Sequence, residues 1–322
     1  MESKINCRLC GVPSGGTFVT VRSGKVLPLY RCSLCDFDFF SHDPSGQLAS
    51  DQLDQSRLKA AGLEIPSMEK DFANGLAQSD GYINEYLDAT DRDQNILEIG
   101  CSWGYFLQLA QKAGTKPFGV EKNAVRSGYV ERELKIPCHA SIKELQSLGL
   151  KFKKIFLFYV LEYIHQPVVL LNNLLALLQN GGQIIMITPN LRDPLKDYLE
   201  NDGFNKFFYD EHAINYFSPT AVKSLIARSL AGGSTITTRQ GYSFANHVTW
   251  FLTNAPRTTG VVGGDNYIRD MLAKLNATAS NSAKDPQVAA RLAELISDFD
   301  RRYKEYLERH SIGNQIRVDI RK

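Results

Sequence analysis

Two pairs of cysteines near the start of the chain have the spacing of metal ligands. They are Cys7-x-x-Cys10 and Cys32-x-x-Cys35, separated by about twenty residues. Four thiolates at this spacing can occupy the corners of a tetrahedron around a structural zinc ion, which leaves no coordination position open for catalysis. Disulfide bonds are the alternative, but no charged-then-apolar leader opens the sequence, so we expect reduced thiols. Residues 1–42 are expected to form a zinc ribbon that depends on metal for folding.

A second stretch, Asn95–Leu107 (NILEIGCSWGYFL), has the pattern of a buried strand, a tight turn and a helix start. Gly100 and Gly104 can adopt backbone angles closed to other residues, and a helix N-terminus offers N–H groups to a negative ligand. Ser102 replaces the second glycine of a dinucleotide-binding turn, and no Gly-Lys-Ser/Thr of a P-loop follows. The next strand ends at Glu121, where a carboxylate can accept hydrogen bonds from two ribose hydroxyls. These features predict a site for a nucleoside cofactor.

Three motifs, in order, resemble those of class I S-adenosylmethionine-dependent methyltransferases. The segment from Glu98 to Gly104, with Glu121 after it, resembles motif I and the acidic position that follows. The segments Val160–Pro167 (VLEYIHQP) and Leu177–Asn190 (LLQNGGQIIMITPN) resemble two later segments of that family. The resemblance implies S-adenosylmethionine as the cofactor, held by Glu98, Gly100, Ser102, Gly104 and Glu121, with further contacts at Ser141, Ile142 and Tyr159.

The elements around these motifs predict an α/β fold. Strands are expected at residues 116–121, 136–140, 155–159, 183–188 and 234–241, alternating with helical stretches, which favours a parallel sheet covered by helices on both faces. Ligands bind outside the carboxyl ends of such strands, so Gly100, Glu121, Ser141, Tyr159 and Asn190 should surround one crevice. The alternating final stretch NQIRVDIRK is a strand that the family fold inserts antiparallel beside the sixth. The expected core is Rossmann-like and seven-stranded.

Five units are expected along the chain. Helix starts are predicted at Pro66-Ser67 and at Ser79-Asp80, and a long amphipathic helix at 286–310 either packs on the body or forms a homodimer contact. The units are a zinc ribbon at 1–42, a helical cap over the active site at 43–94, the cofactor-binding core at 95–243, a helical insertion at 244–311 and the final core strand at 312–322.

The segment Phe204–Val222 (FNKFFYDEHAINYFSPTAV) carries a second resemblance, to zinc-containing sugar methyltransferases. His212 matches the position assigned there as general base, Glu211 is its neighbour, and Tyr209 matches an aromatic position. An imidazole can take a proton from a hydroxyl or an acidic C–H while the methyl donor is held in line. A histidine in an aromatic stretch can also be a core or capping residue, and that alternative stays open.

This resemblance covers residues 1 to about 250 and the final strand, and the second Rossmann-like domain of the sugar C-methyltransferases is not matched. Tyr159 and Tyr163 stand where those enzymes carry Asn and His. Deprotonation at carbon would need the assistance of that Asn and His, whereas a hydroxyl acceptor needs less help from the protein. O-methylation is therefore favoured over C-methylation. The expected function is methyl transfer to a small acceptor such as a sugar nucleotide or glycan intermediate. The identity of the acceptor and the methylated atom do not follow from these residues.

Composition limits the alternatives. The 322 residues carry 37 basic and 35 acidic side chains without a basic stripe, so nucleic acid is not the expected partner. The longest apolar run, from Val168, is too short to cross a membrane, and a cytoplasmic protein is expected. Two alternative functions are compatible with the sequence: an RNA methyltransferase that uses its ribbon to bind RNA, and a non-catalytic scaffold that binds the cofactor.

Overall fold

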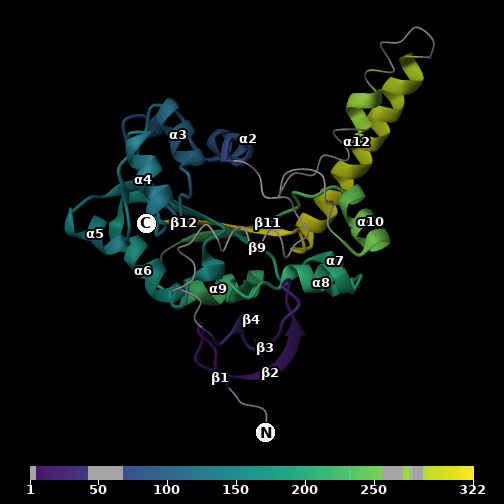
Figure 1. Cartoon of the computed structure of the whole chain (residues 1–322), viewed down its shortest axis with the longest axis horizontal. Coiled ribbons are helices and arrows are strands. Elements are labelled where there is room, and N and C mark those ends of the chain that lie inside the picture. The colour runs from purple at the N-terminus through teal and green to yellow at the C-terminus, as the bar shows by residue number, and fades with distance from the viewer. Residues whose placement is uncertain (1–4, 43–67, 232, 256–270, 276, 278–285) are drawn as a thin grey trace.

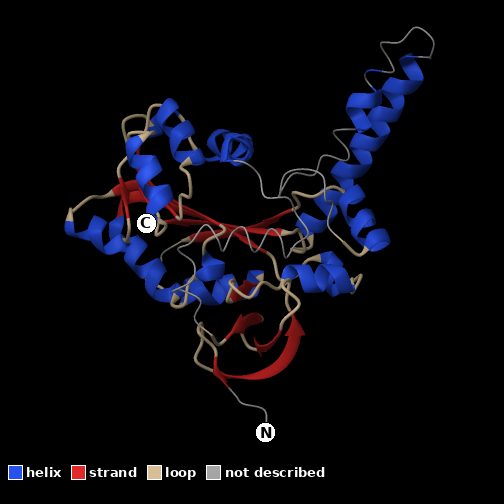
Figure 2. Cartoon of the chain, in the orientation of Figure 1, coloured by secondary structure: helices blue, strands red, loops and turns tan. Residues whose placement is uncertain are grey.

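A computed structural model of the chain describes residues 5–42, 68–231, 233–255, 271–275, 277 and 286–322. A seven-stranded sheet lies at the centre between two layers of helices, and a smaller antiparallel sheet lies beside it (Figure 1 and Figure 2). The predicted segments at 43–67 and 256–270 lie outside the described residues.

The central sheet has the strand order β11-β12-β9-β8-β5-β6-β7. Its parallel part pairs β5 with β6 and β8, β6 with β7, and β8 with β9, while β12 runs antiparallel between β9 and β11. This confirms the predicted Rossmann-like class and the place of the final strand. The strands are β5 (Asn95–Ile99), β6 (Lys116–Val120), β7 (Cys138–His139), β8 (Phe152–Phe158), β9 (Leu178–Pro189), β11 (Ser234–Arg239) and β12 (Gln315–Arg321).

The strands send alternate side chains to two separate cores. On β8, Phe156 faces the core under α2 (Met68–Tyr86), α3 (Tyr105–Lys112) and α4 (Ala124–Arg132). Its neighbours Ile155 and Leu157 face the opposite core. That core is covered by α5 (Ile142–Ser147), α6 (Pro167–Leu177) and α9 (Pro219–Ala227) (Figure 1). The uninterrupted apolar runs in the sequence reflect burial on both faces.

Helix α2 corrects one detail of the sequence-based prediction. The second helix start expected at Ser79-Asp80 does not exist, because α2 continues through both residues to Tyr86. Ser79 is buried at 7% exposure instead of standing free at a helix start. Tyr82 and Tyr86, one turn apart, pack on the central sheet, and this apolar stripe keeps the helix in one piece.

The N-terminal sheet contains four strands from the predicted ribbon and a fifth from much later in the chain. The order is β1 (Ile5–Asn6), β2 (Pro13–Thr20), β3 (Val26–Cys32), β4 (Phe37–Phe40) and β10 (Asn215–Phe217), all antiparallel. So short a segment has little core of its own. Phe37 and Phe39 share one continuous core with Phe217 of β10 and with α9. The ribbon is therefore packed into the body of the protein.

The predicted insertion contributes α10 (Phe244–Thr253) and α12 (Pro286–Arg309). The C-terminal end of α12 packs on β11, where Thr238 Oγ1 donates to the Glu308 carbonyl at 3.0 Å. Toward its N-terminal end, Val288, Leu292 and Leu295 remain about half exposed, and a homodimer through this helix stays a prediction. In the described part of the chain, no helix is both long and apolar enough to span a bilayer.

Candidate active site

The turn after β5 has a left-handed backbone conformation, which residues with a side chain rarely adopt. Gly100, Ser102 and Gly104 all have positive φ, at 72°, 51° and 79°. A Cβ on Gly100 would lie 2.9 Å from Val160 Cγ2, and one on Gly104 would lie 2.8 Å from Leu134 Cδ1. Both glycines are therefore required by left-handed backbone and by close neighbours. The turn ends where Gly104 caps the N-terminus of α3.

Glu121 fastens this turn to the next strand. Its Oε2 accepts a hydrogen bond from the Ser102 backbone N–H at 2.9 Å, and its Oε1 accepts one from the Asn123 backbone N–H at 2.8 Å. Each carboxylate oxygen keeps a second lone pair for an incoming hydroxyl. The arrangement fits a ribose at the carboxyl ends of β5 and β6.

Glu98 lies buried at the end of β5, beneath the turn. Burial raises the pKa of Glu98 well above its ordinary range, and the nearby Glu121 adds to the effect. Glu98 Oε2 has no hydrogen-bond partner within the described residues. An orphaned buried oxygen of this kind is satisfied by water or a bound polar ligand. Together with the glycine turn and Glu121, it fits a nucleoside cofactor such as S-adenosylmethionine.

Helix α2 lies over the turn, a contact that the sequence did not predict by residue. Tyr105 Oη donates to Asp71 Oδ2 at 2.9 Å. Gly75 packs so closely on Tyr105 that a Cβ there would reach the ring at 2.4 Å. Phe72 sits edge-on to the rings of Tyr105 and Tyr129. The described part of the predicted cap is thus attached to the cofactor turn through an acid and aromatic side chains.

The remaining predicted cofactor residues follow neighbouring strands at the same sheet edge. Ser141 precedes α5 and its Oγ donates to Glu144 Oε1 at 3.2 Å, while Ile142 is partly buried against the core. Tyr159 has a positive φ of 56°, and its hydroxyl accepts from Gln315 Nε2 at 2.6 Å. Burial raises the pKa of Tyr159 well above its usual range, with further contributions from the adjacent Tyr82.

Asn190 does not line the expected crevice. It is fully buried, and its amide donates to the carbonyls of Ser311 at 3.1 Å and Gly313 at 2.8 Å. It thereby ties the end of β9 to the turn between α12 and β12. Residues that follow parallel strands usually line the ligand site, but the Asn190 side chain is instead used by Ser311 and Gly313, more than a hundred residues along the chain.

His212 has a carboxylate behind it. The segment follows α8 (Asp202–Phe208), and the His212 Nδ1 atom lies 3.0 Å from Asp210 Oδ1, while Nε2 lies 3.8 Å from Glu211 Oε1. Arg22 in turn holds Asp210 at 3.3 Å. When Nδ1 donates to Asp210, Nε2 is the nitrogen left to accept a proton. At 7% exposure, the imidazole is oriented and largely shielded from water.

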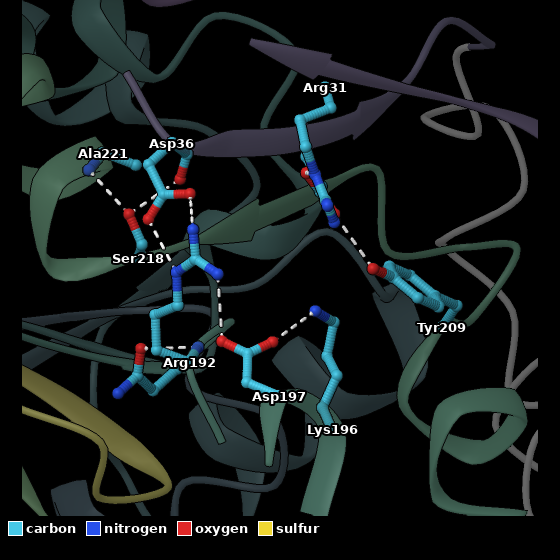
Figure 3. Close-up of polar contacts among 10 residues, drawn as sticks. Arg31, Asp36, Arg192, Lys196, Asp197, Tyr209, Ser218 and Ala221 are labelled. Atoms are coloured by element: carbon cyan, nitrogen blue, oxygen red, sulfur yellow. Dashed lines mark hydrogen bonds and ion pairs between the residues drawn. The ribbon is translucent and has the colours of Figure 1, made fainter. Parts of the chain in front are cut away.

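Tyr209 and Glu211 are both held by the N-terminal sheet. The Tyr209 hydroxyl donates to Asp38 Oδ2 at 2.9 Å, and Arg31 pairs with the same carboxylate at 2.6 Å. Figure 3 shows Arg31 and the Tyr209 ring on facing sides of this contact. Glu211 pairs with Lys25 at 2.8 Å. Tyr209 also borders a cavity of about 520 Å³, whose other lining residues are Val19, Thr20, Lys196, Glu200, Asp202, Asn205 and Lys206.

The four N-terminal cysteines meet in one cluster. Their Sγ atoms all lie within 4.8 Å of one another, and the Cys10 and Cys32 sulfurs are 3.4 Å apart. Tetrahedral zinc with Zn–S bonds of about 2.3 Å places its sulfurs about 3.8 Å apart. All four thiols are free, and Cys7, Cys32 and Cys35 are buried. The cluster fits a structural zinc ion, whose four tetrahedral positions the thiolates would fill.

Asp193 gives the site region a pH-dependent stability. It is buried at the start of α7 (Pro194–Asp197), and its Oδ1 accepts the Leu195 backbone N–H at 2.8 Å. Burial raises the pKa of Asp193 to about 7, and Asp197 adds to the rise. Because the folded pKa exceeds the unfolded value of about 4, the stabilising contribution is complete below about pH 4 and is lost as pH rises through 7.

Asp193→Asn keeps the acceptor for Leu195 but cannot ionise. We expect the variant to unfold with a free energy about 2–4 kcal/mol higher than wild type at pH 8, and with little difference at pH 4. Urea denaturation of both proteins across this range measures the difference. Parallel pH profiles for the two proteins would contradict the assignment of this titration to Asp193.

Comparison with known proteins identifies the core. Residues 75–229 match the protein family described as a methyltransferase domain. This range includes the glycine turn, Glu121 and the His212 segment. No curated protein matches the chain.

Solved structures with similar arrangements are distant. A SAM-dependent methyltransferase from Archaeoglobus fulgidus has a TM-score of 0.47 and 15% identity, over 79% of this chain and 97% of that one. A possible histamine N-methyltransferase from Thermotoga maritima has a TM-score of 0.42 and 12% identity, over 78% and 89%. The plantazolicin methyltransferase BamL, solved with an analogue of desmethylPZN and SAH, has a TM-score of 0.44 and 14% identity, over 84% and 90%.

The family match covers the cofactor turn and the strands from β5 to β9 of the central sheet, whereas β11 and β12 lie outside it. The protein is therefore an enzyme with a class I S-adenosylmethionine-dependent methyltransferase domain.

Proposed function

We propose that this enzyme methylates a small acceptor, a sugar nucleotide or glycan intermediate, on a hydroxyl oxygen, with His212 as the general base. The observation that carries the proposal is the His212–Asp210 contact of 3.0 Å in a buried setting. A histidine whose Nδ1 is fixed by a carboxylate is prepared to accept a proton at Nε2. The acceptor class itself comes from the resemblance of the His212 segment to sugar methyltransferases.

Each group in the site has a distinct part in this reaction. The main chain at Gly100, Ser102 and Gly104 would hold the cofactor, with Glu121 on its ribose. S-adenosylmethionine supplies a methyl group already activated on a sulfonium, so that positioning carries most of the catalysis. His212 Nε2 would take the proton of the acceptor hydroxyl as oxygen attacks the methyl carbon, and Asp210 would stabilise the imidazolium. Because the Tyr209 hydroxyl is bonded to Asp38, we propose that Tyr209 supports the segment, with Glu211 as its second anchor.

The alternative of an RNA substrate has less support. The arginines of the ribbon are turned to internal partners: Arg8 to Asn215, Arg22 to Asp210 and Arg31 to Asp38. Guanidinium groups engaged in this way offer few contacts to phosphates. In the described part of the ribbon, these three arginines therefore contact other residues of the same chain.

The test is formation of S-adenosylhomocysteine by the zinc-loaded protein, measured by mass spectrometry with nucleotide-linked sugars and with total RNA in parallel. Turnover and a mass gain of one methyl group on a sugar nucleotide are expected. Gly100→Val is the control, because its side chain would collide with Val160 and should remove cofactor binding in calorimetry. Turnover with RNA alone, or with no sugar in a broad panel, would overturn the proposed acceptor.

A further inference from the structure

Each of the two cysteine knuckles carries a charged residue directly after a cysteine, and both reach out of the ribbon. Arg8 follows Cys7, and its Nη1 donates to the Ile214 carbonyl at 3.1 Å and to Asn215 Oδ1 at 3.0 Å. Its Nη2 donates to the Phe40 carbonyl. One guanidinium in the first knuckle therefore joins β4 to the strand that follows His212.

Asn215 passes this connection on to the loop after β8. Its Nδ2 donates to the carbonyls of Leu161 at 2.9 Å and Ile164 at 2.6 Å. The Ile214 backbone N–H donates to the Glu162 carbonyl at 2.7 Å. These carbonyls belong to the short helix η2 (Leu161–Tyr163) and its end, directly after Tyr159. A buried amide with both protons used in this way fixes the loop against β10.

The second knuckle makes the matching connection to the loop after β9. Asp36 follows Cys35 in a left-handed conformation, with φ of 55°. Its carboxylate pairs with the Arg192 guanidinium, and Arg192 Nε lies 2.8 Å from Asp36 Oδ2. Arg192 also reaches Asp197 at 2.9 Å (Figure 3). The Asp36 carbonyl accepts from Ser218 Oγ at 2.7 Å, and Ser218 caps α9.

The cofactor turn is not part of this network. Within the described residues, no hydrogen bond or ion pair joins 5–42 to Gly100–Gly104 or to Glu121. The turn is instead held by β6, through Glu121 and the Val120 carbonyl. The ribbon thus contacts the loops on one side of the site and leaves the other side to the core itself.

From this division we infer that the metal cluster works as a clamp on the acceptor side of the active site, with Arg8 and Asp36 as positioning residues. Cys7, Cys10, Cys32 and Cys35 would hold the metal, which would fix the backbones of the two knuckles. Arg8 holds the His212 segment and the loop after β8, and Asp36 holds the loop after β9. The assignment of this side of the site to the acceptor rests on the proposed function, whereas the coupling between the ribbon and these loops does not. Neither residue needs to touch substrate.

The test is amide hydrogen exchange, measured by mass spectrometry on the zinc-loaded full chain. Arg8→Ala should accelerate exchange about tenfold or more at 161–164 and 212–217, with the zinc content and the cofactor Kd unchanged. Arg8→Lys should not restore protection, because an ammonium cannot reproduce the planar fork that reaches these separate acceptors. Asp36→Asn, which tolerates the left-handed backbone, should accelerate exchange at 190–197 instead.

Arg291→Ala is the matched control, since Arg291 pairs with Glu294 on the surface of α12 at 2.8 Å. If Arg8→Ala does not fold, Asn215→Ser removes the Arg8–Asn215 contact and the bonds of the Asn215 amide to the loop after β8 without altering a knuckle. Exchange unchanged in these loops, a uniform increase over the chain, or loss of zinc from Arg8→Ala would overturn the clamp. Once a substrate is identified, Arg8→Ala should lower kcat at least about tenfold while the KM for the cofactor changes less than about twofold. Failure of the proposed acceptor would leave the exchange result intact, so the two failures are distinguishable.

Discussion

Replacing His212 with alanine is expected to lower kcat by about 10²- to 10⁴-fold, the range for loss of a general base. Cofactor affinity and zinc content should stay at wild-type levels, because His212 contacts neither the glycine turn nor the cysteine cluster through any described hydrogen bond. Single-turnover kinetics with a sugar acceptor would separate this loss of the chemical step from an effect on binding. His212→Ala with wild-type kcat would assign the residue to the structural role that its sequence context also allows.

Two further variants make this experiment more specific. Asp210→Asn retains the shape of the side chain that orients His212 but removes its charge, so part of the loss in kcat should appear there. His247→Ala is the matched control, since His247 is an equally buried histidine at 2% exposure, on α10 rather than in the site segment. It should lower the free energy of unfolding and leave kcat unchanged. An equal loss of kcat in both histidine variants would point to packing rather than proton transfer.

The parts of this protein that were predictable from sequence depend on local patterns. The apolar runs of the strands, the glycine turn and the acid after the next strand lie within about thirty residues of one another, and motif order supplied the sheet topology. The cysteine cluster follows the same rule, because two short knuckles specify a tetrahedral site almost without context. These are features in which a residue type is forced by its immediate backbone or by a ligand.

The parts that were not predictable depend on partners far along the chain. β10 is three residues long and pairs with β4, from which it is separated by about 175 residues. No local hydrophobic periodicity therefore predicts this strand. Arg8 is a basic residue that an RNA-binding ribbon would present to phosphates, yet its guanidinium is used at Ile214 and Asn215. The contact of the Tyr159 hydroxyl with Gln315 of the last strand is equally distant in sequence, and the role of Tyr159 in cofactor binding stays a prediction.

These distant contacts change how the ribbon should be regarded. A zinc ribbon read from sequence suggests a module that is appended to an enzyme and binds something else. Here its Phe37 and Phe39 complete the same core as Phe217 and α9, and its charged residues hold the segment that carries His212. Removal of the ribbon would therefore expose part of the enzyme core, and a metal held by its four cysteines would stabilise the whole protein.

Loss of the metal should accordingly destabilise the chain by about 5 kcal/mol or more, since zinc binding by such cysteine sites is coupled to folding. For a chain of 322 residues that corresponds to a fall in Tm of about 7 °C or more. Calorimetry of zinc-loaded wild type, of the same protein after chelation and of Cys35→Ser measures it, with metal content determined in parallel. Cys35→Ser and chelated wild type should unfold at similar temperatures, and adding chelator to the variant should change little.

Cys101→Ser is the control for the thiol itself. Cys101 is buried beside Cys138, with 3.7 Å between their sulfurs, outside the metal cluster. Its loss should cost about 1 kcal/mol while zinc stoichiometry and sensitivity to chelator remain those of wild type. A chelator-insensitive Tm, combined with four fewer reactive thiols in the denatured protein than its six cysteines provide, would show that the cluster is held by disulfides. The clamp would then be a covalent one, and it would respond to reductant where we expect a response to chelator.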